Sequence, residues 1–166
     1  MKVQRIVILD YGSQYTQLIA RRIRELQVYS EIIPFDTSAA KLMEDPPQGI
    51  VLSGGPNSVF EDGAPGIDPE IFKLGIPVLG ICYGMQLMSQ SLGGAVEPGK
   101  EREYGKTEIA TVPGNDLFTG LPEKFTVWMS HGDRVAKIPE GFRVSATSGS
   151  CPYAAIRDEA RRFYAI

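Results

Sequence analysis

The first half of the chain alternates short apolar runs with stretches of helical periodicity. Residues 5–10 (RIVILD) form an apolar run that predicts a strand, and residues 15–26 repeat apolar side chains every four positions, which predicts a helix. The same alternation predicts further strands at 29–33, 49–53 and 78–81 and further helices at 39–44, 68–74 and 83–92. Strands that alternate with helices are typical of a mostly parallel sheet covered by helices on both faces.

The second half of the chain has a different pattern and is expected to be richer in β-structure. Short β-prone segments, separated by Gly and Pro turns, lie at 107–112, 125–129, 143–147, 153–157 and 162–166. Neither an internal repeat nor a linker divides the sequence. We therefore expect residues 1–166 to form one α/β domain with three layers, a central, mostly parallel sheet and helices on both faces.

Composition and charge narrow the possible functions. The 17 Lys and Arg and the 20 Asp and Glu give a net charge of −3, and no dense basic cluster provides the positive surface that nucleic acid or an anionic membrane requires. No apolar run is long enough for a membrane span, and no signal peptide is recognisable, which predicts a cytoplasmic protein. Two Cys and one His cannot form a four-ligand zinc cluster, so no metal is expected.

The sharpest chemical signal is the segment GICYG at 80–84, where a predicted strand meets a predicted helix. It has the form of a nucleophile elbow, a tight turn with a strained central residue, with Cys82 in place of Ser. A thiol at a helix N-terminus lies near unpaired N–H groups and the positive end of the dipole, both of which favour the thiolate. The alternative is that Cys82 is a small buried hydrophobe. For Cys151, which has no elbow around it, that alternative is favoured.

A second signal is the loop SGGPNS at 53–58, directly after a predicted strand. Such a loop directs N–H groups outward and can cradle a phosphate or complete an oxyanion hole. Pro56 lacks an N–H, Asn57 replaces the Asp of ATP-pyrophosphatase loops, and no Walker motif is present, so the oxyanion interpretation is favoured over a phosphate site or a plain turn. Gly55 and Tyr83 are the candidate N–H donors. Because ligands collect at the carboxyl ends of parallel strands, this loop and the elbow are expected to meet.

Together, GICYGMQ at 80–86 and SGGP at 53–56 resemble the class I, triad-type glutamine amidotransferases. ILDYGSQY at 8–15, REYG at 102–105 and the expected loop MSHGD at 129–133 narrow the resemblance to the glutaminase domains of the GMP synthase family. The resemblance covers essentially the whole chain and implies a flavodoxin-like fold. It also implies that a cysteine attacks the glutamine carboxamide and forms a γ-glutamyl thioester, which water then resolves.

The same resemblance assigns roles to residues of this sequence. The nucleophile matches Cys82, and the oxyanion donors match Gly55 and Tyr83. Gln86 matches a side chain on the first helical turn that helps hold the substrate, and Ser130, Gly132 and Asp133 match the loop that orients the amino-acid end of glutamine.

The resemblance also implies a partner. Ammonia would pass to an ATP-pyrophosphatase synthetase part, fused or separate and outside this chain, which uses ATP and Mg to aminate XMP to GMP. No cofactor is implied for the glutaminase domain itself. Two alternatives stay open: another Cys-elbow hydrolase of similar fold, such as a peptidase-like protein or a γ-glutamyl hydrolase, and a regulatory domain that binds glutamine without turnover.

One part of the family pattern has no match in this sequence. The family's triad needs a His and a Glu two residues apart, directly after a segment like RFYAI at 162–166. We therefore expect a domain that is C-terminally incomplete, lacks the base that activates its thiol, and by itself binds glutamine weakly without turning it over. His131 is the sole histidine, and the resemblance places it in a substrate-side or interface loop rather than in the role of base.

Overall fold

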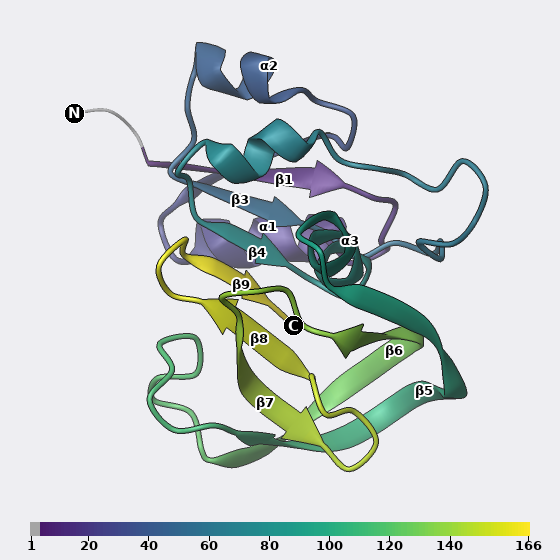
Figure 1. The fold of residues 1–166 in the computed structure, drawn as a ribbon. Helices are drawn as coiled ribbons and strands as arrows, with labels where there is room; N and C mark the ends of the chain where they lie inside the picture. The colour runs from purple at the N-terminus through teal and green to yellow at the C-terminus, as the bar shows by residue number, and fades with distance from the viewer. Residues whose placement is uncertain (1–3) are drawn as a thin grey trace.

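The structure, a computed structural model, describes residues 4–166, with the backbone alone at 100–103 (Figure 1). Its elements are, in order, β1 (Arg5–Asp10), α1 (Thr16–Glu25), β2 (Tyr29–Pro34), α2 (Ala39–Glu44), β3 (Gly49–Leu52), the 3-10 helix η1 (Pro69–Lys73), β4 (Val78–Gly80), α3 (Tyr83–Ser91), β5 (Ala95–Thr111), β6 (Lys124–Lys137), β7 (Arg143–Ser148), β8 (Ala155–Asp158) and β9 (Phe163–Ala165). The elements expected in the first half are present with similar bounds. The segment expected as a helix at 68–74 is a 3-10 helix.

The nine strands of the described chain form one mixed sheet in the order β2-β1-β3-β4-β9-β8-β7-β5-β6. Strands β2, β1, β3, β4 and β9 pair in parallel, in the strand order of flavodoxin-like folds. From β9 through β6 all pairs are antiparallel. A mostly parallel sheet is therefore wrong for the sheet as a whole, because after α3 the chain turns back directly from strand to strand without crossover helices.

Helices cover both faces of the parallel half. Val7 and Leu9 of β1 pack on one face in the cluster that includes residues of α2, η1 and α3. Ile8, between them, packs on the opposite face with Val51 and with Ala20 of α1. Successive side chains of a strand point to opposite faces, so the unbroken apolar run in β1 is what a strand buried on both sides requires. Figure 1 shows α1 and α3 on opposite sides of these strands.

The antiparallel half is built on the long ribbon of β5 and β6, seen in the lower part of Figure 1. The sequence predicted only the pieces at 107–112 and 125–129. The segment at 129–133, expected as a loop, lies inside β6, where polar side chains do not prevent main-chain pairing with β5. The ribbon is irregular there, with a register shift between Pro98 and Glu103. None of the helices in the described residues is long and apolar enough to cross a membrane.

Candidate active site

Cys82 occupies a strained turn between β4 and α3. Its φ is 49° and its ψ is −109°, a backbone conformation that residues other than glycine rarely adopt. The strain predicted for a nucleophile elbow is thus present. Neighbouring strands hold it in place: the N–H of Cys82 donates to the carbonyl of Ile166 at 2.8 Å, and the N–H of Ile166 donates to the carbonyl of Gly80 at 2.9 Å.

The two glycines of the elbow allow α3 to lie close against the sheet. A Cβ on Gly80 would be 2.7 Å from the carbonyl oxygen of Gly84. A Cβ on Gly84 would overlap the carbonyl oxygen of Leu52 in β3. In both cases the obstacle is backbone, which cannot rotate away, so only glycine fits at either position.

Burial sets the electrostatics of the Cys82 thiol. The side chain is half-buried, and desolvation raises the pKa of the thiol above its ordinary value. Burial therefore outweighs the lowering of the pKa that the sequence led us to expect from the helix N-terminus. A thiol that stays protonated near neutral pH needs a base to become a nucleophile.

The loop at 53–58 is anchored at the end of β1 and contacts the elbow. Ser53 is fully buried; its hydroxyl accepts the N–H of Tyr11 at 2.9 Å and donates to the carbonyl of Gly54 at 2.9 Å. A Cβ built on Gly54 would be 3.5 Å from the Cβ of Cys82. The loop and the elbow therefore meet, as the parallel sheet predicted.

Two backbone N–H groups beside Cys82 are available to a ligand. Within the part of the chain that the structure describes, the N–H groups of Gly55 and Tyr83 make no hydrogen bond. Tyr83 is the first residue of α3, where an N–H has no intrahelical acceptor. Both residues line a cavity with Cys82, which is the arrangement an oxyanion hole requires.

This polar cavity has a volume of about 320 Å³ and lies between the loop at 53–58, the elbow and β6. Every residue that the sequence assigned to the site lines it. Six further residues line the cavity. Pro56, Asn57 and Ser58 belong to the loop at 53–58, and His131 lies between Ser130 and Gly132. Glu61 and Tyr104 carried no chemical signal of their own. The full lining is Gly55, Pro56, Asn57, Ser58, Glu61, Cys82, Tyr83, Gln86, Tyr104, Ser130, His131, Gly132 and Asp133.

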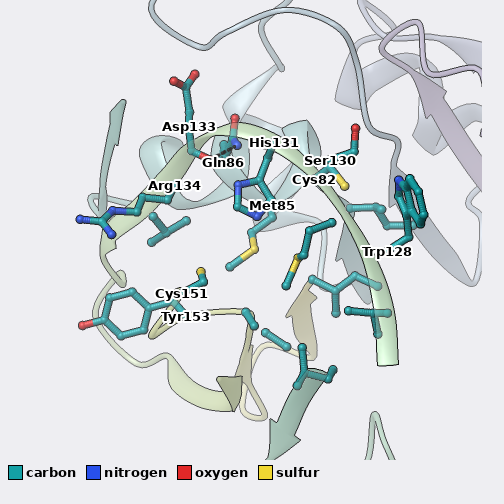
Figure 2. Close-up of a pocket in the computed structure, with 18 of the residues that line it drawn as sticks. Cys82, Met85, Gln86, Trp128, Ser130, His131, Asp133, Arg134, Cys151 and Tyr153 are labelled. Atoms are coloured by element: carbon teal, nitrogen blue, oxygen red, sulfur yellow. Dashed lines mark hydrogen bonds between the residues drawn. The ribbon is translucent and has the colours of Figure 1, made fainter. Parts of the chain in front are cut away.

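A second, apolar cavity of about 300 Å³ adjoins the same thiol (Figure 2). Met85, Met129 and Tyr153 contribute to its wall, and Cys82 and His131 line both cavities. The sequence did not predict it, because its lining comes from α3, the β5–β6 ribbon and the segments around β8. The thiol thus lies at the boundary between a polar space and an apolar one.

Side-chain hydrogen bonds connect the walls of the polar cavity. The amide of Gln86 donates to the backbone carbonyl of Asp133 at 3.0 Å, and the hydroxyl of Ser58 donates to the Asp133 carboxylate at 2.5 Å. Next to Asp133, the guanidinium of Arg134 donates to Glu97 across the ribbon at 2.8 Å and 2.9 Å. In the described residues no group of three or more His, Cys, Asp or Glu could hold a metal ion.

Comparison with known proteins assigns this fold and elbow to a class. Residues 7–166 match the family model described as glutamine amidotransferase class-I. The chain therefore belongs to the class I glutamine amidotransferase family.

Curated relatives within that family are GMP synthases. The chain is 57% identical over 163 residues to GMP synthase [glutamine-hydrolyzing] of Lacticaseibacillus rhamnosus, covering 98% of this chain and 32% of that protein. It is 52% identical over 166 residues to the GMP synthase of Syntrophomonas wolfei, covering 100% of this chain and 32% of that protein. The chain thus spans about a third of the length of these curated relatives.

Solved structures agree with the family assignment. A crystal structure from Thermoplasma acidophilum, described as that of a GMP synthase subunit, superimposes with a TM-score of 0.88 at 32% identity, over 99% of this chain and 83% of that chain. A glutamine amidotransferase from Thermotoga maritima has a TM-score of 0.78 at 21% identity, over 100% of this chain and 75% of that chain, and shows the shared fold.

Proposed function

We propose that this domain hydrolyses glutamine and supplies the ammonia that a synthetase unit uses to convert XMP to GMP. The observation that carries the proposal is the strained elbow of Cys82 beside two unpaired N–H groups. The similarity to GMP synthases supports the choice of acceptor nucleotide. ATP and Mg would act in the synthetase unit, outside these residues, and the reaction is expected in the cytoplasm.

The polar cavity suits the amino-acid end of glutamine. A zwitterion needs acceptors for its ammonium and donors for its carboxylate. Glu61 and Asp133 supply carboxylate oxygens, and Ser130 and Gly132 supply N–H or hydroxyl groups in the same cavity. We assign binding of this end to Gln86, Ser130, Gly132 and Asp133, with Gln86 acting partly through its bond to the Asp133 carbonyl.

The chemistry follows from the position of Cys82. Its thiolate attacks the carboxamide carbon, and the developing oxyanion accepts the N–H groups of Gly55 and Tyr83. A proton must reach the nitrogen before the C–N bond breaks, since an amide anion is a very poor leaving group. Ammonia departs, leaving a γ-glutamyl thioester on Cys82, and water hydrolyses the thioester to glutamate.

The proton carrier is the part of the mechanism that these residues do not supply. The raised pKa of the Cys82 thiol makes a base essential. In the family this base is a His paired with a Glu, and neither matches a position of this sequence. We propose that the 166 residues alone release little ammonia, and that a polypeptide also carrying the family's His and Glu does so efficiently, with His131 outside the base role.

The test uses glutamine labelled with ¹⁵N in its amide. The complete enzyme, supplied with XMP, ATP and Mg, should transfer the label to GMP, and Cys82→Ala should abolish transfer while synthesis from added ammonia continues. Hydrolysis of γ-glutamyl peptides in preference to glutamine would favour the other Cys-elbow hydrolases. Calorimetric binding of glutamine with no ammonia release by the complete enzyme would indicate a regulatory domain instead.

A further inference from the structure

The two walls of the polar cavity come from distant parts of the chain. One wall is the loop at 53–58, which follows β3 of the parallel half, and the other is the segment Ser130–Asp133 within β6 of the antiparallel half. Ser58 and Asp133 are 75 positions apart, and the Ser58 hydroxyl donates directly to Oδ2 of Asp133 at 2.5 Å in a half-buried setting. This bond joins the walls across the cavity.

The β5–β6 ladder is irregular at this part of β6. Pro98 pairs with Asp133 and Glu103 with His131, so the register shifts opposite Gly132. Pro98 also has no N–H to contribute to the ladder. Bonds from outside the ribbon add to the hold on Asp133. These are the amide of Gln86 on its carbonyl and the hydroxyl of Ser58 on its carboxylate.

Ser58 is itself held in a defined conformation. Its hydroxyl oxygen accepts the N–H of Phe60 at 3.3 Å, and its carbonyl accepts the N–H of Glu61 at 3.1 Å. The other end of the loop is fixed by Ser53. Gly55 lies between these two anchors in the loop.

We propose that Ser58 is a positioning residue for glutamine hydrolysis. Through Asp133 it fixes the separation between the oxyanion donor Gly55 and the segment Ser130–Asp133, which holds the amino-acid end of glutamine. This role rests on the function proposed above. A carboxylate has several lone-pair sites, so the bond from Ser58 leaves Asp133 able to accept from the substrate as well.

The variant Ser58→Ala in the complete enzyme tests the proposal. Because a hydrogen bond to a charged group contributes substantially to the free energy that holds Asp133 in place, its loss should lower kcat/KM for glutamine by about tenfold or more. We expect both a higher KM and a lower kcat. Ser58→Thr retains the hydroxyl and should recover most of the activity. The matched control is Ser38→Ala, which also removes a hydrogen-bonding serine hydroxyl, at the start of α2 and away from both cavities.

Three further readouts separate positioning from a general structural role. In Ser58→Ala the melting temperature should fall by no more than the loss of one hydrogen bond requires, so that the protein stays folded in the assay. The rate at which iodoacetamide alkylates Cys82 and GMP synthesis from added ammonia should each match the wild type. A larger fall in melting temperature or a parallel loss in either rate would overturn the positioning role. In combination with Asp133→Ala, removal of Ser58 should add almost nothing, because the bond is already absent; independent, multiplicative losses would also contradict the proposal.

The two proposals fail in different ways. If the wild-type complete enzyme releases no ammonia from glutamine, the proposed function is wrong. If it does so and Ser58→Ala has the wild-type kcat and KM, the function stands and the role of Ser58 is wrong.

Discussion

Replacing Gly55 by Ala tests the oxyanion hole with the smallest possible change. The added Cβ would overlap the carbonyl oxygen of Tyr11 and would lie 3.2 Å from its Cβ. Tyr11 cannot easily give way: it is buried, its N–H is bonded to Ser53, and its ring packs on Phe35 and Tyr83. The loop must therefore move, and Gly55 with it.

The magnitude follows from that geometry. Relief of the overlap needs a displacement on the order of 1 Å, and misplacement of a catalytic group by that distance can lower a rate by about 100-fold. Complete loss of one oxyanion donor costs about 2.7–4 kcal/mol in the barrier, or roughly 10²–10³ in kcat. We expect Gly55→Ala to lower kcat for glutamine hydrolysis by about 100-fold. The overpacking should also cost about 1–3 kcal/mol of stability, which leaves an ordinary domain folded at 25 °C.

The assay compares glutamine-dependent and ammonia-dependent GMP formation by the complete enzyme. Gly55→Ala should lose the first activity and keep the second. Gly66→Ala is the matched control, because Gly66 is exposed and its Cβ would meet nothing within 4 Å. Equal loss of both activities would indicate damage beyond the oxyanion hole. A folded Gly55→Ala variant with wild-type glutaminase kcat would refute the assignment of Gly55.

The remaining predictions concern the elbow. A diazo-ketone analogue of glutamine should label Cys82 and leave the buried Cys151 unmodified, as peptide mass spectrometry would show; a main adduct on Cys151 would contradict the assignment. Since burial raises the pKa of Cys82, alkylation by iodoacetamide should continue to accelerate above the pH at which an ordinary thiol has titrated. For the same reason the folded state keeps a proton in a pH range where the unfolded state has released it. The free energy of unfolding therefore falls as the pH rises through that range. Urea unfolding of the wild type and of Cys82→Ala would detect this fall. Gly84→Ala should destabilise the domain by about 1–3 kcal/mol, despite the better helix propensity of Ala, because the new Cβ would overlap the Leu52 carbonyl. The melting temperature should fall by about 2–4 °C per kcal/mol. An unchanged melting temperature would show that α3 can shift.

The sequence by itself determined the parallel half and the position of the elbow that carries the candidate nucleophile. Strand and helix periodicity are properties of contiguous residues, so β1, α1 and α3 could be placed with nearly the right bounds. The elbow was also local in sequence, because the strain at Cys82 arises within one turn, although the need for glycine at 84 comes from the Leu52 carbonyl of β3. The carboxyl-end rule for parallel sheets then correctly brought the loop at 53–58 to that turn.

Only the tertiary structure decided the rest of the site. The lengths of β5 and β6, and the place of 129–133 inside a strand, depend on pairing between backbones far apart in sequence, which side-chain patterns do not encode. The raised pKa of Cys82 depends on how many groups exclude water around the thiol, and those groups come from both halves of the fold. The bond between Ser58 and Asp133 joins positions with no sequence relation at all. Local pattern can therefore identify a candidate nucleophile, but burial and long-range contact fix its environment and the groups around it.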